Sequence, residues 1–259
     1  MPGYDVSRKE VPHMANHIQC CFARYEKKYW LTPAQQQALL AAAEPRLVKD
    51  RYGAYTICNI YYDTPDYRLI RASLEKPVYK EKLRVRSYGV PREDDPVFVE
   101  LKKKFDGVVY KRRITTTLPE AGPLLAGEDA GAAFGQIGRE IGYFQSFYHT
   151  APRVFIGYDR LAFAGAEDPR VRITFDGNLR WRDTDLDLRL GDGGAPLLGD
   201  DRVLMEIKLP GAAPLWLSRL LSELSVFPTS FSKYGACYSR YLLPRACAEN
   251  SLKEADHCA

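Results

Sequence analysis

Positively charged side chains alternate with apolar ones along several short segments, and this alternation constrains the fold most. Residues 80–86 read KEKLRVR, which places four cations on one face of a β-strand and Leu83 and Val85 on the other. Cations two residues apart on a strand lie about 6.6 Å apart and repel one another by about 2.5 kcal/mol at an effective dielectric of about 20. On an open surface water relieves this repulsion, so one such strand alone would be typical of a solvated sheet face.

The same alternation recurs in further segments, which read FVELKKK (98–104), YKRR (110–113), YDR (158–160), RVRITFD (170–176) and MEIK (205–208). Glu-x-Lys occurs three times, at 26/28, 100/102 and 206/208, with both side chains on one strand face. A solvated sheet face normally mixes charges with Ser, Thr and Gln, whereas these faces carry mainly Arg and Lys. We therefore expect the charged faces to line the inside of a closed barrel, with helices covering the apolar outer faces.

Such a lining calls for a polyanionic ligand. Unpaired cations in a confined, partly desolvated channel are costly. Phosphate groups neutralise them through bidentate contacts to Arg and point-charge contacts to Lys. Specific nucleic-acid binding is disfavoured, because the aromatic residues do not interleave with the basic strands as base-stacking platforms do.

The rest of the chain predicts an α+β fold dominated by antiparallel strands. Strands are expected at 17–31, 54–62, 78–88, 96–104, 108–117, 153–164, 170–181, 185–190 and 202–209. Helices are expected at 66–75, 129–146, 214–225 and 231–242, and another from Pro33 to Pro45 with Thr32 as its cap. We expect residues 1–16 to be a flexible leader, 17–243 one tunnel domain and 244–259 a tail.

Composition excludes other classes of protein. With 46% hydrophobic and 27% charged residues in 259, the chain is neither disordered, collagen-like nor a coiled coil. Its net charge of +4 indicates no partner by itself. Six cysteines without a CxxC pair disfavour a zinc site or a disulfide scaffold and favour reduced thiols and a cytoplasmic location. No apolar run approaches the roughly 18–20 residues of a membrane span, so a membrane partner would be a separate chain.

Nine segments, from about residue 20 to 243, resemble the VTC domain, the polyphosphate polymerase domain of the vacuolar transporter chaperone complex, in the triphosphate tunnel metalloenzyme superfamily. They read RYEKKYWL (24–31), YYDTPD (61–66), KLRVRSYG (82–89), FVELKKK (98–104), YKRR (110–113), GYDR (157–160), RVRITFDGNLR (170–180), LMEIKLPG (204–211) and FSKYGACYSRYL (231–242). The resemblance implies an antiparallel β-barrel of about eight strands that forms a tunnel, with helices packed outside and at the ends. It further implies that the tunnel holds triphosphate or polyphosphate together with Mn²⁺ or Mg²⁺.

The matching motifs also imply site residues. Those expected to align a reacting phosphate are Arg84, Arg86, Lys102 and Arg160. Those expected to bind phosphate elsewhere are Lys28, Lys111, Tyr158, Arg172, Lys208, Ser232 and Lys233. Glu206 is implied as the principal metal ligand, with Glu26 and Glu100 as further candidates and Asp176 as a supporting carboxylate. Related triphosphatases carry Glu-x-Glu-x-Lys on the first strand, whereas residues 24–28 here read RYEKK, which favours the VTC branch.

Three functions stay open at this point. The first is extension of polyphosphate from the γ-phosphate of ATP, in which the attacking phosphate is already ionised and needs no general base. The second is hydrolysis of tripolyphosphate or a nucleoside triphosphate, for which Glu26 or Glu100 would position water. The third is a module that binds polyphosphate without turnover. The physiological donor and the oligomeric state do not follow from the sequence.

Overall fold

The charged strands do form one antiparallel sheet. The computed structural model describes residues 25–106, 108–128 and 131–245, so the predicted leader and nearly all of the predicted tail lie outside the described residues. The strands are β1 (Tyr25–Leu31), β2 (Leu47–Asp63), β3 (Tyr79–Tyr88), β4 (Val97–Phe105), β5 (Val108–Thr116), β6 (Ala151–Gly165), β7 (Arg172–Arg182), β8 (Ala195–Pro196), β9 (Val203–Leu209) and β10 (Pro228–Thr229).

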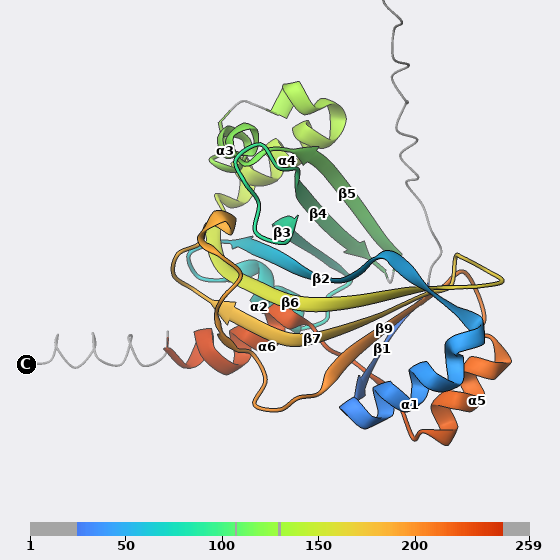
Figure 1. Cartoon of the computed structure of the whole chain (residues 1–259). Helices are drawn as coiled ribbons and strands as arrows, with labels where there is room; N and C mark the ends of the chain where they lie inside the picture. Colours follow the sequence, from blue (N-terminus) through green and yellow to red (C-terminus); the bar gives the residue numbers. More distant parts are fainter. Residues whose placement is uncertain (1–24, 107, 129–130, 246–259) are drawn as a thin grey trace, which may run out of the picture.

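These strands make a ten-stranded sheet in the order β10-β1-β9-β7-β6-β2-β3-β4-β5, with β8 paired to β7 (Figure 1). In the described part of the chain β10 and β5 end this order, so hydrogen bonds do not close the sheet into the barrel of about eight strands that we expected. The α+β class and the antiparallel pairing are confirmed.

Most helices lie outside the sheet and at its ends, as predicted, whereas the C-terminal helix packs against the other face of the sheet (Figure 1). The α-helices are α1 (Pro33–Ala43), α2 (Arg68–Leu74), α3 (Leu118–Leu125), α4 (Gly135–Tyr148), α5 (Leu215–Glu223) and α6 (Lys233–Cys237), which continues as a π-helix over Tyr238–Leu242. Short 3₁₀ turns cover Glu44–Arg46, Gly131–Phe134 and Leu188–Leu190. None of the helices in the described residues has the length and apolar character needed to span a bilayer.

The first helix begins where the sequence predicts. The Thr32 hydroxyl accepts the backbone N–H of Gln35 at 3.2 Å, and the Gln35 side chain accepts the N–H of Thr32 at 2.9 Å. Pro33 occupies the first turn, where its missing N–H costs nothing. This reciprocal cap fixes the point at which β1 turns into the helix.

Apolar residues of the strands point outward and pack under the helices. Leu83, Leu101 and Val99 lie in one buried cluster with Ile141 and Phe144 of α4. A second cluster joins the outer faces of β1, β7 and β9 to α1 and α5, through residues that include Leu31, Phe175, Met205, Leu39 and Leu217. This leaves the charged side chains on the opposite face, which we call the inner face.

The two halves of the inner face approach one another. β1 and β3 are separated by four strands in the sheet order, yet their lysines reach neighbouring residues of one segment. The Lys28 ammonium donates to the Phe231 carbonyl at 3.0 Å, and the Lys82 ammonium donates to the Ser232 hydroxyl at 3.2 Å. The sheet is therefore curved around the inner face, which is consistent with a tunnel-like fold.

Part of the inner face is apolar. Ile57, Ile156 and Tyr158 of β2 and β6 pack in a third buried cluster with Tyr234 and Tyr238 at the C-terminal helix. The charged part of the inner face is therefore bounded on one side by this cluster.

The structure corrects three details of the sequence prediction. Residues 185–190 are not a strand, since Asp187 caps a 3₁₀ turn by accepting the Arg189 N–H at 2.8 Å. The helix predicted at 129–146 begins only at Gly135, after a 3₁₀ turn. Helix α3 was not predicted, although Thr117 and Glu120 form the capping box that marks its start.

Candidate functional site

Cross-strand register brings the cations of β3, β4 and β5 into rows on the inner face. Lys82, Lys102 and Lys111 form one row, and Arg84, Glu100 and Arg113 form the next. Directly opposed side chains lie about 5 Å apart, so each row is one contact group. The first row contains cations only, and the second is built around a carboxylate.

Glu100 is the shared acceptor of the second row and is 1% exposed. Its carboxylate accepts Arg84 Nε at 2.8 Å and Lys111 Nζ at 2.7 Å, and Arg113 binds the same group. Burial alone would raise the pKa of Glu100, but Arg84 and the other surrounding cations hold it well below its usual range. Glu100 therefore stays ionised and fixes Arg84 and Arg113 in place.

Asp176 plays the same part on β7 and is fully buried. It accepts Arg160 Nε at 2.6 Å on one oxygen and Lys233 Nζ at 2.6 Å on the other. Although burial opposes ionisation, Lys233 and Arg160 lower the pKa of Asp176. The carboxylate thereby joins β6, β7 and the start of α6 at one point.

Arg86 and Tyr158 connect these two acidic centres. Arg86 donates to the Asn59 side chain at 2.9 Å and to the Tyr158 hydroxyl at 3.3 Å. The Lys233 ammonium lies 4.3 Å from the centroid of the Tyr158 ring. Burial would raise the pKa of Tyr158, yet Arg86, Arg160 and Lys233 lower it, which reflects the density of positive charge around this hydroxyl.

Glu206 differs from Glu100 and Asp176. Lys28, Lys233 and Lys208 lie 3.6, 3.7 and 3.8 Å from its oxygens, beyond hydrogen-bond distance. Burial would raise its pKa, but Lys233 and Lys28 lower it, so the group is ionised. Its oxygens accept no hydrogen bond from the described residues and stay available to a ligand.

Glu26 lies beside this carboxylate. Its oxygen is 3.6 Å from Lys28 Nζ, the same distance at which Lys28 contacts Glu206. Thr174 is the cross-strand partner of Glu206, and its buried hydroxyl oxygen has no hydrogen-bond partner in the described residues. Glu206, Glu26 and Thr174 thus place oxygen atoms around one part of the inner face.

These oxygens fit a hard divalent cation. Mg²⁺ is commonly held by one or two carboxylates, with water and substrate phosphate completing its coordination. No cluster of three or more acidic, His or Cys side chains suited to a metal is present among the described residues. Glu206 with Glu26 would therefore hold a cation that substrate phosphates also bind, rather than form a site closed by protein alone.

Other cations of the inner face lack a carboxylate partner. In the described part of the chain, no Asp or Glu oxygen lies within 4.0 Å of Lys82, Lys102 or Arg86. Burial lowers the pKa of Lys102, as do Lys28, Arg84 and Lys208, and Glu26 only partly offsets this. Lys102 of β4 thus lies near charges of β1 and β9, across the inner face.

Arg172 and Lys208 lie at the edge of the charged region. Arg172 is opposite Lys208 in the sheet register, but its guanidinium is exposed and binds Asp50 at 3.3 Å. Lys208 is one-third exposed and contacts Glu206. The Arg172 side chain is 44% exposed, against 11% for Arg160.

Ser232 and Lys233 begin α6, as the sequence indicates. The Ser232 hydroxyl accepts the N–H of Gly235 at 3.1 Å and caps the helix, while Lys233 turns inward to Asp176. The structure thus brings all eleven predicted phosphate-contacting residues onto or beside the inner face. Their roles in binding and catalysis stay predictions.

Sequence reasoning missed two contributors. Arg113 follows Arg112 in YKRR, and strand alternation could have assigned it to the face of Lys111. Asp176 was expected only to support a metal, whereas it is the buried partner of Arg160 and Lys233. Nothing in the local sequence indicates which cation a carboxylate will bind across strands.

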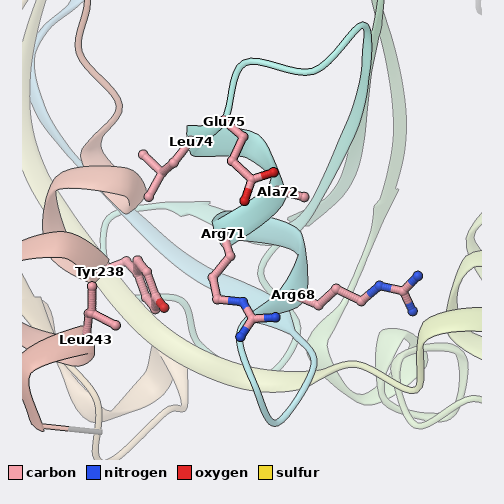
Figure 2. A pocket seen from close by; sticks show the side chains of 7 residues that line it. All are labelled: Arg68, Arg71, Ala72, Leu74, Glu75, Tyr238 and Leu243. Atoms are coloured by element: carbon pink, nitrogen blue, oxygen red, sulfur yellow. The ribbon is translucent and has the colours of Figure 1, made fainter. Parts of the chain in front are cut away.

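A surface pocket of about 690 Å³ lies away from this site, between α2 and the C-terminal helix (Figure 2). Its lining residues are Arg68, Arg71, Ala72, Leu74, Glu75, Tyr238 and Leu243. Arg71 is already paired with Asp66 at 3.2 Å, and none of the predicted site residues takes part. The inner face, not this pocket, is the candidate site.

Comparisons with known proteins agree with the geometry. A solved protein from Hippeastrum, a proposed adenylyl cyclase (HpAC1) described as having a dominant triphosphatase activity, is 17% identical, with a TM-score of 0.50 over 83% of this chain and 94% of that one. A proposed adenylate cyclase from Bacillus halodurans is 13% identical, with a TM-score of 0.48 over 80% and 92% of the two chains. The likeness to the Hippeastrum protein shows that the two chains share a fold. No curated protein sequence matches the chain.

The family comparison covers most of the sequence. The profile of the VTC domain matches residues 23–242, which include every strand and α-helix of the described residues. The resemblance carried by the strand motifs is thereby confirmed. The chain belongs to the VTC domain family.

Proposed function

We propose that this protein is a metal-dependent phosphotransferase that extends polyphosphate with the γ-phosphate of ATP. The observation that supports it most is the charge on the inner face, where Arg86, Lys82 and Lys102 lack carboxylate partners among the described residues. A triphosphate or polyphosphate chain supplies the missing negative charge through several contacts at once. The family to which the chain belongs agrees with this chemistry.

The arginines of the site are suited to position a phosphate. Glu100 fixes Arg84 through two hydrogen bonds, and Asp176 fixes Arg160 in the same way. Because these guanidiniums are already oriented, little reorganisation is needed when negative charge develops during transfer. Lys102, with no such partner, would bind the reacting phosphate as a mobile charge.

A divalent cation would be held by Glu206, with Glu26 beside it. When bound, Mn²⁺ or Mg²⁺ would neutralise charge on the triphosphate. The nucleophile, a terminal phosphate of the growing chain, is ionised near neutral pH, so these residues need only align it. This is consistent with an inner face that has no histidine or cysteine among the predicted site residues.

Hydrolysis is the second candidate. Glu100 is occupied by three cations, which leaves Glu26 as the carboxylate that could position a water molecule. The triphosphatase activity described for the Hippeastrum protein, which shares the fold, gives this alternative its weight. Hydrolysis would release orthophosphate from tripolyphosphate with no longer product.

Chain length distinguishes these functions. We would incubate the protein with ATP and Mn²⁺, resolve polyphosphate on a gel and measure orthophosphate in parallel. We expect a lengthening polyanion with ADP, and a loss of at least about tenfold in rate for Lys102→Met and Glu206→Gln. Lys103→Met is the matched control, because Lys103 lies on the outer side of β4 with Glu81 and Glu140.

Each other outcome has a definite meaning. Release of orthophosphate without chain growth would show that the protein is a triphosphatase and not a transferase. Tight binding of tripolyphosphate with no product would indicate a binding module. Equal rates for Lys102→Met, Lys103→Met and the parent protein would place the chemistry away from the inner face.

A further inference from the structure

Lys82 lies where the two sides of the inner face meet. It belongs to the middle of β3, and its ammonium donates to the Ser232 hydroxyl at 3.2 Å, at the start of α6. The same hydroxyl accepts the N–H of Gly235 at 3.1 Å. A serine hydroxyl has two acceptor positions and one hydrogen to donate. With both acceptor positions occupied, the Ser232 hydrogen is free to bind an anion beside Lys82.

The charged groups that face Lys82 are positive or already neutralised. Lys80 and Arg84 flank it on β3, Lys102 is its partner on β4, and Lys28 approaches from β1. Arg84 is paired with Glu100, and Lys28 contacts Glu26 and Glu206. No carboxylate of the described residues lies within 4.0 Å of Lys82 itself.

Two further groups near α6 offer Lys82 no charge. Asp63, at the end of β2, uses its carboxylate to accept the N–H groups of Leu69 and Ile70 and the hydroxyl of Tyr234. Lys233, next to Ser232, is bound to Asp176. When Lys82 is charged, none of these groups neutralises it, and a bound anion would do so.

The lack of a nearby carboxylate affects the protonation of Lys82. Burial, together with Lys80, Lys102, Lys28 and Arg84, lowers the pKa of Lys82 to about 7. Burial likewise lowers the pKa of Lys111 to about 8, although Glu100 opposes the shift. A bound polyanion reverses this effect, since it stabilises the ammonium by direct contact and neutralises the surrounding cations.

We propose that Lys82 is a further phosphate-binding residue, and that its amine takes up a proton from solvent when a triphosphate or polyphosphate chain occupies the inner face. No covalent bond changes in this step: the neutral amine becomes an ammonium, which binds phosphate together with the Ser232 hydroxyl. The inference rests on the proposed function in that it takes the same ligand, but it does not depend on turnover.

Calorimetric titration with tripolyphosphate tests it directly. Titrations at pH 8.5 in two buffers of different ionisation enthalpy give the number of protons taken up on binding. We expect net uptake by the parent protein and an affinity that falls with rising pH, by up to about tenfold per pH unit for each linked proton. Any proton that tripolyphosphate itself gains or loses on binding is common to the parent protein and its variants, so the difference in proton uptake between them reports on Lys82.

Two variants distinguish the effect of the positive charge at residue 82 from the effect of proton uptake by Lys82. Lys82→Met should lower affinity by about tenfold or more and reduce the proton uptake. Lys82→Arg keeps a permanent charge, so affinity should stay within severalfold of the parent while the proton uptake still falls. Lys103→Met, on the outer side of β4, should change neither quantity. Thermal unfolding confirms that each variant is folded.

Unchanged affinity and proton uptake in Lys82→Met would overturn the inference, and so would a Lys82→Arg variant that takes up as many protons as the parent protein. If the parent protein does not bind tripolyphosphate at all, this inference and the proposed function fail together. Binding with Lys82-dependent proton uptake but no turnover would support the inference and contradict only the transferase activity.

Discussion

Single carboxylates decide how the charged residues of this protein are arranged. Glu100 and Asp176, both buried, bind between them five cations, which come from three strands and one helix. A buried ion pair adds little net stability, but removing one partner leaves the other charge uncompensated. These two residues therefore hold the arginines and lysines in fixed directions and make the fold sensitive to their loss.

Glu100→Gln should destabilise the protein by about 3–5 kcal/mol, because three cations lose the charge that they share. Urea unfolding measures this change in the free energy of unfolding. Glu140→Gln is the matched control, since Glu140 contacts Lys103 and Arg112 on the outer side and is partly exposed. We expect Glu140→Gln to lower the free energy of unfolding by about 0–1 kcal/mol. Equal costs for the two variants would contradict the central role of Glu100.

Acid should unfold the protein through the same groups. The pKa values of Glu100, Glu206 and Asp176 are lowered from ordinary values of 4.5, 4.5 and 3.8. A lowered pKa in the folded state adds stability above the ordinary value, and this is lost as the pH falls towards the folded-state pKa. The urea midpoint should therefore fall from about pH 5 downward, and less steeply in Glu100→Gln. A midpoint that is constant to about pH 2 would contradict these shifts.

Among the elements, α6 is attached to the sheet through Tyr234. The Tyr234 hydroxyl donates to Asp63 at 2.8 Å, and the Tyr234 ring stacks on Tyr61 with centroids 4.8 Å apart. Tyr61 in turn accepts a hydrogen bond from Arg84 at 3.1 Å. The position of Lys233, the neighbour of Tyr234, is thereby linked to β2 and β3.

Tyr234→Phe should lower the free energy of unfolding by about 1.5–3 kcal/mol, since the hydroxyl binds a buried carboxylate. It should also weaken tripolyphosphate binding severalfold, because α6 loses its attachment beside Ser232 and Lys233. Tyr241→Phe removes a hydroxyl that binds the Leu197 carbonyl at 3.2 Å, and should leave binding unchanged. If Tyr234→Phe lowers stability but not affinity, α6 is positioned by other contacts.

Much of this arrangement could be predicted from local sequence. Alternation along β3 and β4 indicates which side chains share a face, and Thr32 with Pro33 marks the start of α1, because both signals act over a few residues. The ten-strand order, and the lack of a hydrogen-bonded closure among the residues that the structure describes, could not be predicted, since they depend on pairing between segments far apart in the chain. The partners of Glu100 and Asp176 were missed for the same reason.

At the scale of the whole molecule, charge is separated between the two faces of the sheet. Lys28 and Lys102 lie on the inner face, whereas their neighbours Lys27 and Lys103 point the other way. Since binding of a polyanion by many cations is strongly screened by salt, tripolyphosphate affinity should fall by about tenfold or more between 0.05 and about 0.5 M salt. Affinity that is independent of salt would contradict a binding site built from charge.

Amine labelling of the lysines, with and without polyphosphate, tests the central claim most directly. Lys27 and Lys28 on β1, and Lys102 and Lys103 on β4, are matched pairs in which one residue faces inward and its neighbour outward. We expect polyphosphate to protect Lys28 and Lys102 from modification at pH 8 and to leave Lys27 and Lys103 reactive. Equal protection of both members of each pair, or of neither, would contradict a ligand enclosed by the inner face.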